Sequence, residues 1–195
     1  RQATVTYTEN GVTKTAKYSY TVENSVTGVT INKPSKTTYK HGESLAAGKV
    51  TLTYADGTTS QGNWSDVTIT DGGTVITALP TPTEAEYKAS STPHKISKTL
   101  KLNYTKDGVT ATEVSYPIEI INDVKSIAMY QVPKQNYSVN DPIDVTGGEI
   151  MVTRAVGSEA IAITKEMTSG FDSSKEYLNN SLTITVSYTE NGITP

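Results

Sequence analysis

The side chains with catalytic potential are few and scattered. The chain of 195 residues contains no cysteine and two histidines, His41 and His94. Without cysteine, a thiol nucleophile, a disulfide scaffold and a cysteine-ligated zinc site are excluded. Both histidines fall in expected loops and no Gly-x-Ser-x-Gly motif accompanies them, which favours solvated loop histidines over catalytic ones. We therefore expect a protein that is not an enzyme and that carries no cofactor.

Two groups of aspartates could supply oxygen ligands to calcium. They are Asp56, Asp66 and Asp71 in one part of the chain, and Asp141, Asp144 and Asp172 in another. Calcium prefers roughly six to eight oxygens that converge from loops, and neither group follows the spacing of an EF-hand loop. Aspartate is also common in turns, because its side chain bonds to the backbone two residues on. We favour that role over a calcium site.

Aromatic side chains are the best candidates for ligand contacts. Trp64, the single tryptophan, stands among turn residues, and Tyr87 lies in the Pro-rich stretch 78–93. An aromatic ring offers an apolar face to a sugar, and tyrosine adds a polar tip. Most tyrosines instead share alternating positions with valine and isoleucine, which indicates packing inside a sheet protein. Trp64 and Tyr87 are therefore predicted contacts only for a ligand-binding alternative.

The elements that position these residues are β-strands. Apolar and polar residues alternate over Ala16–Val22, Leu100–Tyr104 and Leu182–Tyr188, which places the apolar set on one face of a sheet. Dipeptides typical of tight hairpin turns occur at Asn10-Gly11, Asp107-Gly108 and Asn191-Gly192. No stretch has a convincing helical period, and the nearest, Thr83–Ser90, is short and flanked by proline. The sequence predicts an all-β protein.

Composition and charge narrow the possible partners. The net charge of −3 argues against a general nucleic-acid binder, which would carry a basic surface. The sequence contains no apolar run that approaches the roughly 18 residues needed to cross a bilayer. We expect no nucleic-acid partner and no membrane insertion.

A long internal repeat organises the chain. Thr4–Val22 is similar to Lys101–Ile120, and a third copy begins at Thr183. Residues 29–59 are similar to residues 124–159, and in this second pair Tyr54 falls opposite Arg154. A repeat of about 85–100 residues is too long for a solenoid unit and suits an immunoglobulin-like sandwich.

The phase of the repeat divides the chain into three parts. Residues 1–24 are expected to be the last hairpin of a preceding domain, or of a domain that they complete by strand exchange. Residues 25–122 form a complete immunoglobulin-like domain with an inserted loop near 78–93, whose prolines cannot join a central ladder. Residues 123–195 are expected to be a second such domain that lacks its last strand. The missing strand leaves an open groove that a strand of another copy could fill, unless the chain ends are boundaries cut from a longer array.

The segment Tyr39–Thr59 carries a resemblance to a known family. Its Gly-Glu-Ser-Leu and the later Gly-Lys-Val-Thr-Leu-Thr-Tyr-Ala-Asp-Gly-Thr-Thr resemble the bacterial immunoglobulin-like (Big-type) domains of Gram-positive surface proteins. Glu166–Asp172 and Val186–Thr189 resemble the same group. The second repeat departs from the pattern, with Arg154-Ala155-Val156-Gly157 where the first has Tyr54-Ala55-Asp56-Gly57.

The resemblance implies two tandem sandwiches in an extracellular protein of the bacterial cell wall or surface. It implies a structural role as a stalk, an adhesin spacer, or a building block of a surface layer or fibre. The implied partners are neighbouring domains of the same chain or of other copies. The alternatives are an adhesin module that binds carbohydrate or a host protein, and an immunoglobulin-like domain of a phage virion.

Overall fold

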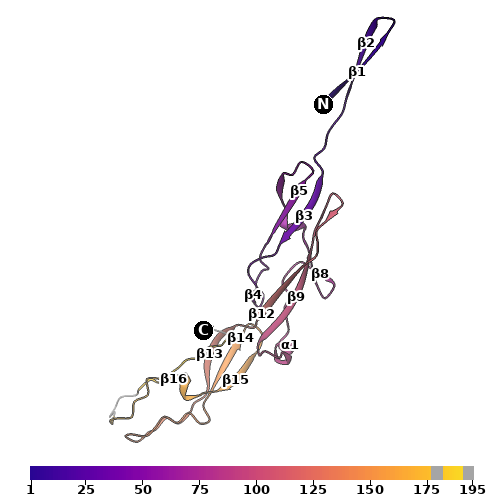
Figure 1. Cartoon of the computed structure of the whole chain (residues 1–195). Helices are drawn as coiled ribbons and strands as arrows, with labels where there is room; N and C mark the ends of the chain where they lie inside the picture. The colour runs from indigo at the N-terminus through magenta and orange to yellow at the C-terminus, as the bar shows by residue number, and fades with distance from the viewer. Residues whose placement is uncertain (177–181, 191–195) are drawn as a thin grey trace. The chain divides into compact units, whose positions relative to one another are not determined.

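The computed structural model describes residues 1–176 and 182–190, and its parts are all-β except for one short α-helix (Figure 1). Contacts divide the chain into two compact units. The first unit holds residues 1–35, 46–75 and 101–116, and the second holds residues 36–45, 76–100 and the described residues from 117 onward. The all-β prediction is confirmed.

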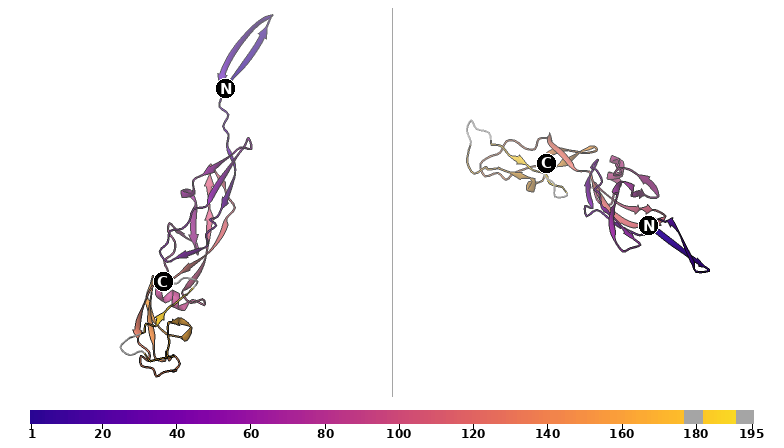
Figure 2. Two further views of the ribbon diagram at one scale, coloured as in Figure 1. Left: turned by 90° about the vertical axis from the view of Figure 1, so that its left-hand side faces the viewer. Right: turned by 90° about the horizontal axis from the view of Figure 1, so that it is seen from above.

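The chain begins with an isolated hairpin. β1 (Gln2–Glu9) and β2 (Val12–Ser19) pair antiparallel along their whole length, and the turn at Asn10-Gly11 has the positive φ angles that its sequence predicts. They form a two-stranded sheet, which lies next to the N label in both views of Figure 2. Almost every residue of the two strands is exposed, so the apolar face of this hairpin covers no core.

The rest of the first unit is built on antiparallel strands. β3 (Val26–Asn32), β5 (Lys49–Tyr54) and β6 (Thr59–Gly62) form a three-stranded sheet, and a 3-10 turn, η1 (Trp64–Asp66), follows. β10 (Thr105–Lys106) and β11 (Val109–Thr110) form a small ladder near β3.

A five-stranded sheet has residues in both units. Its order is β4 (Thr38–Lys40), β12 (Val114–Ile121), β9 (Lys95–Asn103), β7 (Thr68–Asp71) and β8 (Thr74–Ile76). Period-two alternation buries Leu100 and Leu102 of β9 and Tyr116, Ile118 and Ile120 of β12.

The predicted insertion near 78–93 contains the helix that the periodicity did not predict. The helix α1 (Glu84–Ala89) has only six residues, too few to show a helical period. A capping box fixes its start, because the Thr83 hydroxyl accepts from the Glu86 N–H and the Glu86 carboxylate accepts from the Thr83 N–H. Buried Tyr87 anchors it.

The second unit ends in shorter sheets. β13 (Val124–Gln131), β14 (Glu149–Arg154) and β15 (Ser158–Ala162) form a three-stranded sheet, and after the 3-10 turn η2 (Lys165–Met167) β16 (Thr168–Ser169) pairs with β17 (Thr185–Val186). The core consists of four buried residues and the partly buried side chains around them: Val124, Ile150, Val152, Ile163, Ile127, Val145, Ile161, Met167, Val186 and Tyr188.

The sequence repeat has a counterpart in strand register. β3 pairs with β5 through Val26 opposite Tyr54, and β13 pairs with β14 through Val124 opposite Arg154. Both ladders then shift register at the same step, between Val26 and Gly28 and between Val124 and Ser126. Aligned residues thus occupy the same ladder positions through the first bulge and up to Ile31 and Met129, after which only the β13–β14 ladder shifts again, between Met129 and Gln131.

Candidate functional site

Arg154 is the centre of a buried polar cluster in the second unit. Its side chain is 2% exposed, and its guanidinium donates to Glu190 and, over 3.0 Å, to Glu159 Oε1. Burial opposes its charge, yet hydrogen bonds with Tyr188 and Glu159 and the nearby Glu190 raise the pKa of Arg154. The arginine is therefore held as a cation between two carboxylates.

His94 joins the same carboxylates from the turn before β9. Its backbone has a φ of +57°, and its Nε2 lies 3.3 Å from Glu159 Oε1 and 3.7 Å from Glu190 Oε1. The side chain is only 13% exposed. The interpretation of His94 as a solvated loop histidine is thus wrong, because residues distant in sequence fold over it.

Asn122 holds the turn that follows Arg154. Its Oδ1 accepts from the Val156 N–H at 2.9 Å, and its Nδ2 donates to the Val156 carbonyl at 2.8 Å. In the first repeat, Asn24 Oδ1 accepts from the Asp56 N–H at 3.2 Å. The two asparagines therefore clamp equivalent turns, and the buried one makes two bonds.

Asp123 is the next residue and is buried as well. Its Oδ2 lies 2.9 Å from Lys125 Nζ and 3.8 Å from Lys40 Nζ, while its Oδ1 has no hydrogen-bond partner. The first repeat has Ser25 at this ladder position. A buried carboxylate oxygen without a hydrogen-bond partner costs folding stability, so this cluster depends on the contacts that the other oxygen makes.

Tyr87 and His41 form a second contact close by. The Tyr87 hydroxyl lies 3.2 Å from His41 Nδ1, and the rings meet edge to face at 5.9 Å. Burial, aided by the negative charge of Asp123, raises the pKa of Tyr87 to about 12. Tyr87 is 1% exposed, so it presents no ring to a ligand in this structure.

The cluster has the chemistry of a structural joint. Its cavity, lined by Tyr87, His94, Asn122, Arg154 and neighbouring residues, measures about 10 Å³. A single water needs about that much room, so no substrate fits. The carboxylates of Glu159 and Glu190 both face the Arg154 cation. The arrangement joins the chain around residues 84–94 and 119–123 to the strands β14 and β15.

The other predicted ligand contact, Trp64, is partly buried in the first unit. A Cβ built on Gly48 would lie 2.6 Å from its ring, so Trp64 packs directly on the glycine backbone. Its role as a ligand contact stays a prediction.

The predicted calcium ligands lie in turns or bond locally. Asp56 Oδ1 accepts from the N–H and hydroxyl of Thr58, and Asp144 Oδ1 accepts from the Thr146 N–H. Asp141 Oδ2 likewise accepts from the Ser138 N–H. Within residues 1–176 and 182–190, no three His, Asp or Glu side chains gather as metal ligands.

A large groove opens in the second repeat. It has a volume of about 830 Å³ and is lined by residues of three segments, 129–145, 163–176 and 182–186. Many lining side chains are apolar, among them Met129, Val139 and Leu182, which are about half exposed. The groove thus brings partly exposed apolar side chains of these three segments together.

The chain was compared with family models, curated proteins and solved structures, and nothing matches it. In the described part of the chain, no helix has the length and apolar character needed to span a bilayer. The function is therefore argued from the geometry above.

Sequence reasoning did not find this cluster. His94, Arg154, Glu159 and Glu190 are far apart in the chain, and only the fold brings them together. The sequence feature that pointed to the cluster is the difference between the two repeats at one position, where Tyr54 of one copy corresponds to Arg154 of the other. A buried ladder position that changes from an aromatic residue to a cation requires new carboxylate partners.

Proposed function

We propose that this chain is a non-catalytic structural module of an extracellular bacterial surface protein, built from two tandem immunoglobulin-like sandwiches. The observation that carries the proposal is the repeated ladder, in which aligned residues share the first bulge, the register that follows it up to Ile31 and Met129, and the asparagine clamp. A fold unit that is repeated along the chain suits a stalk, spacer or lattice element.

The buried cluster supports the same role. A spacer must transmit position from one repeat to the next, and a junction of hydrogen bonds and ion pairs resists bending better than a bare linker. Asn122 and Asp123 lie where the two sequence repeats meet, and the Asn122 N–H donates to the His94 carbonyl. The carboxylates of Glu159 and Glu190 in turn lie near both His94 and Arg154. The charge and composition of the chain also fit a secreted, hydroxyl-rich surface.

Single-molecule pulling tests this function. The chain has no cysteine, so Thr27→Cys and Ser187→Cys provide unique attachment points at exposed positions near the start of the first repeat and near the end of the second. We expect two separate force-resisting unfolding events, one for each repeat. A chain that extends without resistance would contradict a structural module.

The adhesin alternative is tested separately on a glycan array, with Trp64→Ala beside the wild type. We expect no glycan whose binding depends on Trp64. Binding that the substitution abolishes would overturn the structural proposal in favour of a carbohydrate-binding module.

A further inference from the structure

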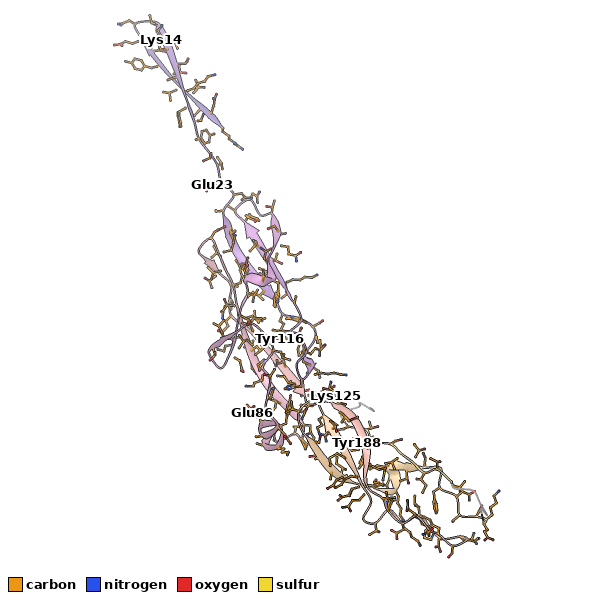
Figure 3. All side chains as sticks on the ribbon, turned by 180° about the vertical axis from the view of Figure 1, so that it is seen from behind. Lys14, Glu23, Glu86, Tyr116, Lys125 and Tyr188 are labelled. Carbon is orange, nitrogen blue, oxygen red and sulfur yellow. The ribbon has the colours of Figure 1, made fainter. Side chains whose placement is uncertain are left out.

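The insertion 78–93 distinguishes the first repeat from the second. The stretch between Tyr54 and Tyr104 is longer than the aligned stretch that begins at Arg154 by the length of this insertion. The insertion contains α1, and in Figure 3 the helix that carries Glu86 lies beside the start of the second repeat. The first repeat thus presents to its neighbour an element for which the second repeat has no corresponding residues.

Helix α1 and His94 contact residues of the second repeat. A Cβ built on Gly157 would lie 2.3 Å from Glu84 Cδ, so the Glu84 side chain packs on the backbone of the turn after β14. His94, directly after the insertion, lies 3.3 Å from Glu159 Oε1 and 3.7 Å from Glu190 Oε1. All these residues belong to the second compact unit, which therefore joins part of the first repeat to the second repeat.

The first repeat has different side chains at the positions that surround His94 in the second. The aligned pairs are Tyr54 with Arg154, Thr59 with Glu159, and Lys106 with Glu190. The turns themselves have a similar backbone, with a φ of +82° at Gly57 and of +81° at Gly157. The two repeats therefore differ in the charges that they offer at these positions, and a lysine stands where the second repeat has a carboxylate.

We propose that the insertion and His94 form a junction element that is specific for the charges of the repeat that follows. The required charges are one buried arginine and two carboxylates, here Arg154, Glu159 and Glu190. This inference rests on the proposed structural function and adds a fixed order of repeats to it. The Arg154 side chain is 2% exposed, so its charge requires the carboxylates beside it. A repeat with the side chains of the first would instead place a lysine beside His94 and remove both carboxylates.

A matched pair of lysine substitutions tests this specificity. Glu190→Lys and Glu149→Lys both introduce the lysine that the first repeat has at the aligned position, but Glu149 lies at the start of β14, outside the cluster. Spin labels at Ser97→Cys and Ala160→Cys, exposed positions of β9 and β15, report the distance between the repeats by pulsed electron paramagnetic resonance. We expect Glu190→Lys to at least double the width of the distance distribution and Glu149→Lys to leave it unchanged. Equal widths for the two variants would overturn the proposal.

A rescue experiment tests whether His94 itself recognises the following repeat. The exchange variant, which combines Arg154→Tyr, Glu159→Thr and Glu190→Lys, has the side chains that the first repeat accommodates at the aligned positions. The introduced lysine faces His94 without a counter-charge, so we expect a broad distance distribution. Adding His94→Glu supplies a carboxylate and should reduce the added width by at least half. Broadening that His94→Glu leaves unchanged would overturn the proposal.

The inference and the proposed function fail separately. Two unfolding events in the pulling experiment, together with equal widths for Glu190→Lys and Glu149→Lys, would remove the order of repeats and leave the structural function standing. A wild-type chain that extends without resistance would contradict the structural function, whatever the widths are. Two unfolding events in Glu190→Lys would confirm that its broader distribution comes from the junction and not from an unfolded repeat.

Discussion

Arg154 stands where the first repeat has Tyr54, and this one difference turns a packed position into a charged one. Its side chain is buried between Glu159 and Glu190, and its Nε has no hydrogen-bond partner. Such a cluster stabilises the fold only while all its members are present, because removing one partner leaves a buried charge without its counter-charge.

We expect Arg154→Ala to lower the free energy of unfolding by about 3 kcal/mol, since it leaves two carboxylates facing each other and His94. Urea denaturation measures the change. Lys101→Ala is the control, because its pair with Glu113 is exposed and should be worth less than about 1 kcal/mol. Equal losses for the two variants would show that burial of Arg154 carries no special weight.

Because of Tyr87, we expect the free energy of unfolding to depend on pH in the alkaline range. Its pKa is raised to about 12 in the folded chain, against about 10 for an unperturbed tyrosine. Between these values the unfolded chain releases a proton that the folded chain keeps, so the free energy of unfolding falls as pH rises from about 10 to 12.

Tyr87→Phe should remove this part of the alkaline loss. The variant is expected to be less stable than the wild type at pH 7, where it lacks the bond to His41, and to approach it above pH 10. Denaturation curves at pH 7 to 12 test this, with the exposed Tyr130→Phe as control. A stability difference that stays constant with pH would contradict the prediction.

At the scale of elements, an asparagine side chain holds the equivalent turn in both repeats, but it makes a different number of hydrogen bonds in each. Asn122 is buried and bonds Val156 twice, whereas Asn24 is exposed and bonds Asp56 once. Loss of a buried hydrogen-bonding group costs about 1–3 kcal/mol, and an exposed one is replaced by water.

We therefore expect Asn122→Ala to lower the free energy of unfolding by about 2 kcal/mol and Asn24→Ala by less than half of that. Chemical denaturation of the two variants side by side gives the comparison. A larger loss for Asn24→Ala would mean that the first clamp, although exposed, controls its repeat more than the second.

The elements differ in how well the sequence predicts them. Strands such as β9 and β12 follow from alternation, because each has one buried face. The hairpin turns at Asn10 and Asp107 follow from residues that tolerate positive φ. Helix α1 does not follow, since its six residues depend on a cap and on Tyr87. The Arg154 cluster depends on contacts between distant segments, which a period of two does not encode.

At the scale of the whole molecule, the hairpin β1–β2 contributes little to the stability of the remaining chain. Its apolar residues are exposed, among them Val5, Tyr7, Val12 and Tyr18. Exposed side chains add almost nothing to the free energy of folding, because they are equally exposed in the unfolded chain.

Removing residues 1–22 should therefore leave the thermal midpoint of a dilute sample within about 2 °C of the wild type, since about 1 kcal/mol corresponds to a few degrees in a chain of this size. Differential scanning calorimetry measures the midpoint. A fall of ten degrees would show that the hairpin already packs on its own molecule.

The shared register of the two repeats has a consequence for recombination between repeats in the gene. A genetic exchange can join part of one repeat to the matching part of the other. In the product, the two members of a ladder pair, such as Val26 with Tyr54 or Val124 with Arg154, still come from matching positions and lie opposite each other. A gene of this kind can gain or lose whole repeats by unequal recombination while each junction still folds. The Arg154 cluster sets the limit, because a crossover that separates Arg154 from Glu159 or Glu190 strands a buried charge.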